Sequence, residues 1–167
     1  MNLLEYKKRE LETMSNDKND VSYKYLKWFL DNAIYIKDIN KSMSHELGLK
    51  AEVKNCYRNS FNNIWKQGLR YVEGYIFSKP CPIPLEHAFL IDDNNMIVDP
   101  TMGIPEELKA KQFKKQGIEY IPNKHKSDIT QNEYLGIVID NKTISSIICK
   151  RQTYDNNLIE LYLKSQA

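Results

Sequence analysis

Three residues of this chain, Cys56, His87 and Asp99, have side chains that together could perform nucleophilic catalysis. A cysteine thiolate attacks carbonyl carbon, an imidazole takes the thiol proton and later protonates the leaving group, and a carboxylate orients the imidazole. The chemistry of such a triad is acyl transfer through a thioester. Each residue also has an ordinary interpretation, as a small buried thiol, a strand histidine and a turn aspartate before Pro100.

The position of Cys56 favours a reactive thiol. The segment from Asn55 to Gly68 predicts a helix, and Cys56 lies in its first turn, where free N–H groups and the helix dipole stabilise a thiolate. Cys56 is also one step off the apolar stripe of that helix, so we expect it to face a cleft. The stripe consists of Tyr57, Phe61, Ile64 and Trp65.

The other two cysteines predict neither disulfides nor a metal site. The chain has three cysteines, an odd number, and no C-x-x-C motif, which argues against a disulfide framework or a four-cysteine zinc site. Cys81 lies between two prolines and is expected to flank the entrance of the cleft. Cys149 follows two isoleucines and is expected in the core.

Of the three histidines, His87 is the best candidate for the general acid and base, because it begins the apolar strand that continues to Ile91. His45 is expected near a helix end, and the residues after it do not complete an H-E-x-x-H motif. His125 lies between two lysines in a polar segment, which is typical of a solvated loop.

Whether Asp99 can reach His87 depends on the hairpin between them. Side chains alternate between the two faces of a sheet, so the loop length decides which residues share a face. A three-residue loop that pairs Asp92 with Met96 puts Asp99 opposite Phe89, with His87 diagonal to it on the same face. A five-residue loop puts His87 directly opposite Asp99. A two-residue turn would send the two side chains to opposite faces, so the triad requires an odd loop.

Substrate contacts are predicted close to the triad. The backbone N–H of Cys56 is the natural first donor to an oxyanion, and Asn55, Asn40 or a group near Trp28 are candidates for the second. We expect Asn55, Tyr57 and Glu73 to contact the substrate. Glu73 or Glu86 could contact a substrate amine, although a strand glutamate is more often simply exposed.

The elements that must position these residues indicate an α+β fold, with N-terminal helices packed on an antiparallel sheet. Residues 1–48 read as helical and residues 55–140 as the core of a single domain that spans 1–167. Cys56 is expected at a helix N-terminus, and His87 and Asp99 on adjacent strands. The individual predictions are helices over 3–11, 25–36, 39–47, 55–68, 105–113 and 158–163, strands over 70–78, 87–92, 96–99, 117–121 and 134–139, a Pro-rich loop at 80–84, and a strand or helix over 143–150.

The composition restricts the class of protein. A chain of 167 residues with 41% hydrophobic and 28% charged residues is typical of one soluble domain, and 24 basic against 22 acidic residues give no broad patch for nucleic acid. A basic stretch over 109–126 is diluted by glutamates and is typical of a solvated face. No apolar run is long enough to span a membrane. The charged first fourteen residues are unlike a secretory signal, so we expect a cytoplasmic protein.

The order of these motifs resembles the transglutaminase-like branch of the papain-like cysteine proteases. The resemblance rests on the helix-start cysteine, the run from Tyr71 to Tyr75, the strand that begins His87-Ala88-Phe89, and Asp99 followed by Pro100 and Thr101. It covers residues 55–101. It implies that Cys56 is the nucleophile, His87 the general acid and base, and Asp99 the orienting group. Phe89 replaces a tryptophan that is usual in the family, and no glycine precedes Cys56.

We therefore expect a cysteine-dependent acyl-transfer enzyme that hydrolyses or transamidates a peptide or protein amide, without a metal or other cofactor. One alternative is an acyltransferase similar to the arylamine N-acetyltransferases, although those enzymes are larger. Another is a non-catalytic bacterial or phage module that binds a peptide or protein in the cleft. The reactivity of the Cys56 thiol would discriminate an enzyme from a binding module.

Overall fold

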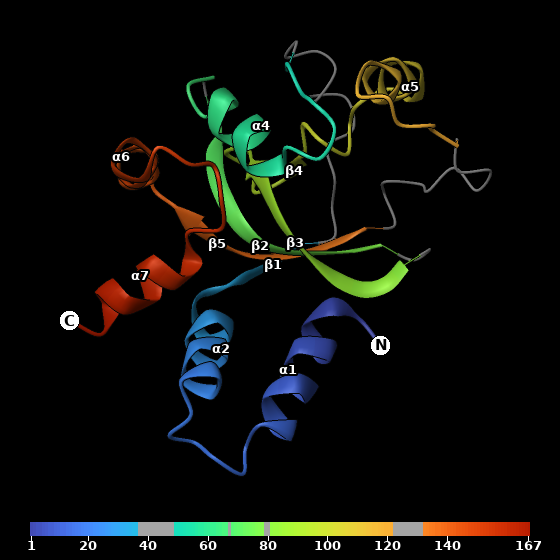
Figure 1. Ribbon diagram of the computed structural model, residues 1–167. Coiled ribbons are helices and arrows are strands. Elements are labelled where there is room, and N and C mark those ends of the chain that lie inside the picture. The colour runs from blue at the N-terminus through green and yellow to red at the C-terminus, as the bar shows by residue number, and fades with distance from the viewer. Residues whose placement is uncertain (37–48, 67, 79–80, 122–131) are drawn as a thin grey trace.

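The computed structural model describes residues 1–36, 49–66, 68–78, 81–121 and 132–167. Within these ranges the fold is α+β, with helices grouped around a single curled antiparallel sheet (Figure 1). This confirms the predicted α+β class with an antiparallel sheet, whereas Asp99 lies just past the strand on which it was expected. The predicted helix over 39–47, together with Asn40, His45 and His125, lies outside the described residues.

The sheet has the strand order β1-β5-β2-β3-β4. Its longest strands, β2 and β3, form a hairpin, and β5 pairs with the other edge of β2. The strands are β1 (Ile34–Ile36), β2 (Arg70–Ser78), β3 (Cys81–Ile91), β4 (Ile97–Val98) and β5 (Glu133–Ile139). His87 therefore lies on a strand that has β2 on one side and only the short β4 on the other.

Two glycines allow the sheet to curl next to His87. Gly74 of β2 pairs with His87 on one side and with Gly136 of β5 on the other. A Cβ atom at Gly74 would lie 2.1 Å from the Leu135 carbonyl oxygen, and one at Gly136 would lie 2.7 Å from a methyl group of Val72. No real side chain tolerates such distances, so the close approach of β2 and β5 requires glycine at both positions.

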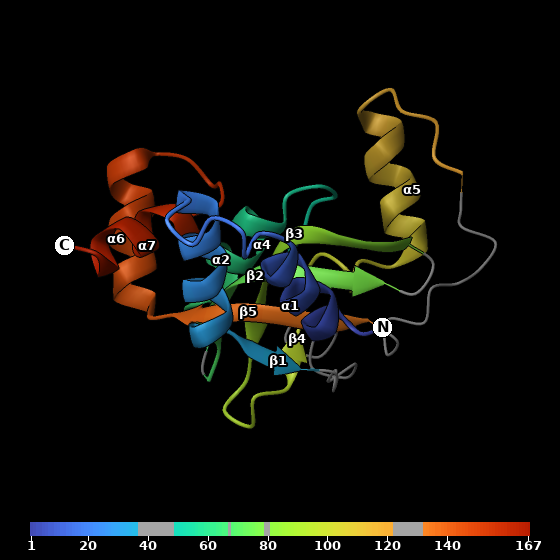
Figure 2. The ribbon, with the colours of Figure 1, turned by 90° about the horizontal axis from the view of Figure 1, so that it is seen from below.

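Six helices lie in the described part of the chain, and Figure 2 shows α5 standing away from the others. Asp20 and Asp140 cap α2 and α6 by accepting backbone N–H groups, and Asn2 forms a capping box with Glu5 at α1. The helices are α1 (Leu3–Thr13), α2 (Val21–Asn32), α4 (Cys56–Asn63), α5 (Glu106–Lys115), α6 (Asn141–Arg151) and α7 (Leu158–Ser165).

Apolar side chains cover both faces of the sheet. One face, which carries Tyr71, Ala88 and Leu90, packs against residues of α1, α2, α6 and α7, such as Leu3, Phe29, Ile144 and Leu158. The opposite face carries a smaller cluster of Val72, Ile76, Phe89, Ile91, Ile97 and Tyr134. Side chains of β3 alternate between the two clusters, so His87 shares its face with Phe89 and lies beside the smaller cluster.

Several local predictions need correction. The apolar spacing that continued the second helix to Ile36 is wrong at its end, because Ala33 is extended and residues 34–36 pair with β5. The strand over 117–121 is absent, since these residues have no partner strand among the described ranges and Ile121 is 78% exposed. The Pro-rich loop is wrong over 81–84, which belongs to β3.

Two predictions of burial are also wrong. Cys149 lies on an exposed face of α6, where Ile147 and Ile148 make the inward contacts instead. Helix α4 ends at Asn63, so Trp65 falls beyond the helix and is 71% exposed. The ambiguous segment 143–150 is helical, in α6, and the predicted helix over 158–163 is confirmed as α7.

Candidate active site

The hairpin between β3 and β4 brings His87 and Asp99 together. Leu90 pairs with Val98, and the Asp92 N–H donates to the Met96 carbonyl at 3.0 Å, so the loop has the three-residue form. Asp99 then lies one position past the end of β4, on the same face as His87. The His87 Nε2 and Asp99 Oδ2 atoms are 2.7 Å apart. The odd-loop geometry that the triad requires is therefore present.

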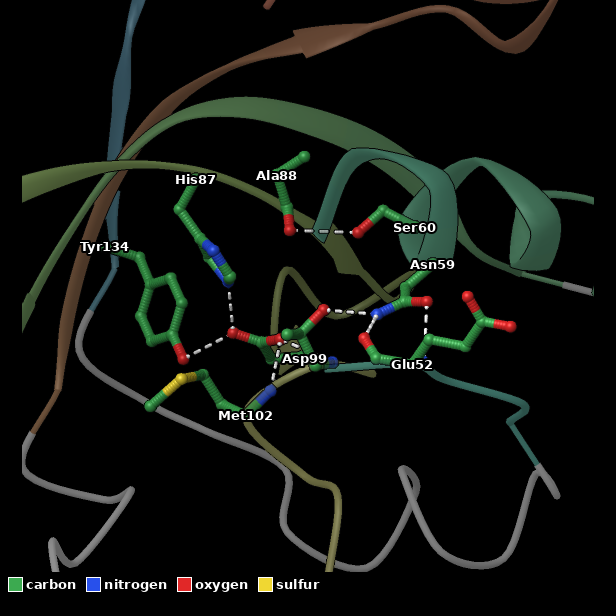
Figure 3. A network of polar contacts seen from close by, with 9 residues as sticks. Glu52, Asn59, Ser60, His87, Ala88, Asp99, Met102 and Tyr134 are labelled. Atoms are coloured by element: carbon green, nitrogen blue, oxygen red, sulfur yellow. Dashed lines mark hydrogen bonds and ion pairs between the residues drawn. The ribbon is translucent and has the colours of Figure 1, made fainter. Parts of the chain in front are cut away.

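Asp99 is fully buried, and both of its carboxylate oxygens accept hydrogen bonds (Figure 3). Oδ1 accepts the backbone N–H groups of Thr101 and Met102, each at 3.0 Å, which is the turn geometry that an aspartate before proline favours. Oδ2 accepts the Tyr134 hydroxyl at 2.9 Å in addition to His87. Burial disfavours the charge, but the imidazolium of His87 and these donors outweigh it and hold the pKa of Asp99 below its ordinary value.

Helix α4 carries Cys56 at its first position and is fixed to the rest of the site through side chains one turn further on. The Ser60 hydroxyl donates to the Ala88 carbonyl at 2.9 Å, which joins α4 to the strand that carries His87 (Figure 3). Asn59 Nδ2 donates to the Glu52 carbonyl at 2.7 Å and to the Thr101 hydroxyl at 2.9 Å. These bonds tie Cys56 to both elements that supply the other two residues.

The Cys56 thiol is partly buried and interacts with His87. Burial raises the pKa of Cys56, but hydrogen bonding with His87, the imidazolium charge and the Ala88 backbone N–H outweigh it, so the pKa is lowered overall. Burial likewise opposes protonation of His87, yet the Asp99 charge and the bonds to Asp99 and Cys56 raise the pKa of His87 above its ordinary value. The two opposite shifts both favour the thiolate–imidazolium pair over the thiol and the neutral imidazole.

The Asp99 carboxylate is bonded to one nitrogen of the His87 ring, Nε2, and leaves the other nitrogen, Nδ1, outside that bond. This is the arrangement that lets an imidazole pass a proton at one nitrogen while a carboxylate fixes its orientation at the other.

The start of α4 offers a donor for an oxyanion. No side chain caps this helix, so the N–H groups of its first turn are not satisfied by a capping residue. Lys54 has a φ of 63°, the left-handed conformation, and turns the chain into the helix. The Asn55 side chain donates to Glu52 Oε2 at 2.9 Å, which directs its amide to the preceding loop. Trp28, another candidate for the second donor, packs against Tyr162 of α7.

Tyr57 and Glu73 were both predicted to contact substrate, and they differ in their hydrogen bonds. The Tyr57 hydroxyl is buried and makes no hydrogen bond among the described residues. Glu73 is fully buried and accepts bonds from the Tyr71 hydroxyl at 2.9 Å and from the Asn157 backbone and side chain at 2.7 and 2.6 Å. Its carboxylate holds the start of α7 against the sheet, so this position does not support a contact with a substrate amine.

Sequence reasoning missed the residues that support the triad. Tyr134 is fully buried on β5, 35 positions after Asp99, and no local pattern links the two. Asn59 and Ser60 form part of a buried polar face of α4, although the apolar stripe suggested that the tyrosine and phenylalanine side of the helix was the inward one. A buried polar helix face next to a candidate cysteine would have been the only signal.

Known proteins and general features of the structure add no further assignment. No family model, curated protein or solved structure matches the chain. The described residues contain no group of three or more histidine, cysteine or acidic side chains arranged to hold a metal ion. In the same ranges no helix is both long and apolar enough to cross a lipid bilayer.

Proposed function

We propose that this protein is a cysteine-dependent acyl-transfer enzyme in which Cys56 is the nucleophile, His87 the general acid and base, and Asp99 the orienting group. The observation that carries the proposal is the buried, hydrogen-bonded pair of His87 and Asp99, beside which the Ser60–Ala88 bond holds the helix that begins at Cys56. The lowered pKa of Cys56, for which His87 is a cause, agrees with it. The roles are those that the resemblance of residues 55–101 to transglutaminase-like enzymes implies. An amide of a peptide or protein is the proposed substrate.

The geometry supports a two-step reaction. The Cys56 thiolate adds to the amide carbonyl, whose oxyanion is placed to accept the Cys56 backbone N–H at the open start of α4. The imidazolium of His87 gives its proton to the leaving amine as the C–N bond breaks, which leaves a thioester. Neutral His87 then takes a proton from water or from a second amine as that nucleophile attacks, and the thiolate is released. Asp99 stays ionised throughout and stabilises the imidazolium.

The alkylation rate of Cys56 with iodoacetamide between pH 5 and 9 tests the thiolate–imidazole pair. In the wild type we expect Cys56 to react at pH values well below the ordinary thiol pKa of about 8.5. In His87→Gln, which keeps a donor toward Asp99 but carries no exchangeable charge, the reaction should follow an ordinary thiol. Exposed Cys149 serves as an internal reference in the same peptide digest.

Acyl transfer itself is tested with p-nitrophenyl acetate. The wild type should release a burst of one equivalent of nitrophenolate and carry one acetyl group on Cys56 by peptide mass spectrometry. Cys56→Ser should show neither. An identical pH profile in the wild type and His87→Gln, with no burst, would overturn the proposal and leave a module that binds rather than transforms its ligand.

A further inference from the structure

The outer edge of β3 runs past the candidate active site, and two hydrogen bonds show which of its residues face outward. The Asp92 N–H reaches Met96 on the β4 side, and the Ala88 carbonyl accepts the Ser60 hydroxyl of α4. Backbone groups of a strand point alternately to its two sides, so the residues two and four positions earlier or later face the same way. Glu86 is the next outward-facing position before Ala88.

The outward-facing residues of β3 have different partners along this edge, and Glu86 has none on that side in the described part of the chain. Leu90 pairs with β4. Ala88 meets α4 through the Ser60 hydroxyl. Glu86 pairs with Tyr75 of β2 as a cross-strand neighbour, but its outward N–H and carbonyl have no partner in the described part of the chain, and its exposed carboxylate forms no ion pair there. Within the described ranges, the outward-facing main-chain groups of Glu86, one residue before His87, are therefore unpaired.

Two exposed apolar side chains accompany this open edge. Leu85 is 53% exposed and Ile83 is 60% exposed, on a strand whose continuation from His87 to Ile91 is buried. Leu85 lies two residues before His87 and shares its face of the sheet. Ile83 lies where the register between β2 and β3 shifts, because Ile76 pairs with Leu85 but Ser78 pairs with Cys81. Bulges of this kind are frequent beside active sites and at sheet edges.

We propose that the substrate is bound as an extended peptide that adds to the outer edge of β3 at Glu86, with an apolar side chain against Leu85 and Ile83. The inference deepens the proposed function and rests on it. One residue of the peptide donates to the Glu86 carbonyl and accepts the Glu86 N–H, as in strand addition. A strand at this edge runs toward α4, which begins at Cys56 and meets the same edge at Ala88 through the Ser60 hydroxyl.

The sequence of β3 limits how far such pairing extends. Proline has no N–H, so Pro84 removes a donor from the strand and shortens the ladder that a second chain could form. A short pairing site is suited to a peptide that must be released after reaction. It also disfavours edge-to-edge association of two copies of this chain, because proline at an exposed edge blocks continuous pairing.

Labelling with acetyl-Leu-Val-Gly chloromethyl ketone tests the site through Cys56. The reference probe is chloroacetone, which has the same reactive group without a peptide, and the measured quantity is the ratio of the two alkylation rates. We expect a ratio well above one, and a fall of about tenfold when the valine amide is N-methylated or when Glu86 is replaced in Glu86→Pro. That proline removes an outward N–H and no bond to β2. Glu86→Ala, which keeps the N–H, should retain the ratio.

Side-chain recognition is tested with a matched pair of exposed leucines. Leu85→Asp should lower the ratio, whereas Leu163→Asp on α7, where the side chain is 60% exposed, should not. Equal ratios in the wild type, Glu86→Pro and Leu85→Asp would overturn the proposal.

Binding without reaction separates this proposal from the proposed function. The amide acetyl-Leu-Val-Gly-NH2 should slow hydrogen exchange of the Glu86 N–H in the wild type and in Cys56→Ser, and its N-methylated form should not. If iodoacetamide and p-nitrophenyl acetate show an inert thiol but exchange still slows, peptide binding stands and catalysis fails. If the thiol is reactive but the peptide gives no protection, the edge proposal fails alone. Protection that rises with protein concentration in the absence of peptide would assign the edge to a second copy of the chain.

Discussion

Two carboxylates, Asp99 and Glu73, are fully buried on opposite faces of the sheet, and they ionise differently. Asp99 faces the imidazolium of His87 and three neutral donors, and its pKa lies below the ordinary value. Glu73 has Tyr71 and Asn157 as donors, all neutral, and burial raises its pKa to about 6 despite them. Neutral hydrogen bonds thus do not offset burial of the Glu73 charge, whereas a cation does for Asp99.

The two carboxylates thus have different roles: Asp99 stabilises the charged form of His87, whereas Glu73 holds a helix in place. At the Asp99 region, ionisation of three groups is coupled, and the pKa of Cys56 is lowered through His87. At the Glu73 region the bonds join β2 to the first residues of α7. Substitution of Asp99 should therefore change the alkylation rate of Cys56, whereas substitution of Glu73 should change the stability of the fold.

The largest expected effect follows from Asp99→Asn. The amide oxygen can keep the N–H groups of Thr101 and Met102, which leaves the amide nitrogen to donate to His87 Nε2 and hold a neutral ring with its proton on Nδ1. Without the imidazolium, the pKa of Cys56 returns toward its ordinary value. Alkylation by iodoacetamide at pH 6 should therefore fall, by about tenfold for each step of one by which the pKa of Cys56 rises.

Glu73→Gln is the matched variant for that experiment. It should leave the alkylation rate within about twofold, and should instead destabilise the fold by about 1 to 3 kcal/mol, because the amide nitrogen cannot accept the buried Asn157 N–H. Circular dichroism must show that both variants are folded. If Glu73→Gln slowed alkylation as much as Asp99→Asn, the division between a chemical and a structural carboxylate would be wrong.

The pH dependence of stability gives the next effect. The pKa of Glu73 is about 6 in the folded state against a reference of 4.5, so the folded state binds the proton more tightly. The contribution of Glu73 is most favourable below pH 4.5 and declines as the pH rises through 6, by about 2 kcal/mol in the free energy of unfolding. Urea denaturation at several pH values, wild type minus Glu73→Gln, isolates this change.

Asp99 and His87 also make the free energy of unfolding depend on pH. Their contributions cancel in that subtraction, because the wild type and Glu73→Gln both contain the two residues. The lowered pKa of Asp99 gives stability above its unfolded value that is lost as pH falls through the folded pKa. The raised pKa of His87 gives stability that is complete below its unfolded value and is lost as pH rises through the folded pKa. A difference curve that is flat between pH 4.5 and 6 would contradict the assignment of Glu73.

The antiparallel sheet could be predicted from the sequence, and so could the condition under which His87 and Asp99 share a face, because both depend on local rules. The loop length that meets this condition was left open and is seen only in the structure. Strand alternation and an odd loop bring two residues twelve positions apart onto one face. The start of α4 close to Cys56 also followed from short-range periodicity, but the helix ends at Asn63 and not at Gly68 as predicted.

Features that depend on tertiary context could not be predicted. The contact of Tyr134 with Asp99 requires β5 to pair with β2, which is a long-range choice. The prolines in 80–84 suggested a loop, but an edge strand has no need of an N–H on its open side, so β3 includes Pro82 and Pro84. Glu73 is buried because the start of α7 packs against it and supplies donors, and no sequence pattern near β2 predicts that contact.

The smallest effects come from removing one hydroxyl at each carboxylate, in Tyr134→Phe and Tyr71→Phe. Both hydroxyls donate at 2.9 Å, so each loss should cost about 1 kcal/mol of folding stability. The two variants should differ in the alkylation rate of Cys56 and in the pH dependence of stability. Tyr134→Phe should slow alkylation of Cys56 about two- to fivefold, because Asp99 loses one of four donors and stabilises His87 less.

Tyr71→Phe should leave alkylation unchanged and move the pH-dependent loss of stability to higher pH, because the Tyr71 hydroxyl is one of the groups that lower the pKa of Glu73. Stopped-flow alkylation and urea denaturation on the same two proteins measure both quantities. If Tyr71→Phe shifted the Cys56 profile, or Tyr134→Phe left it unmoved, the two carboxylates would be coupled through the sheet, and Glu73 would have to be counted among the groups that set the reactivity of the thiol.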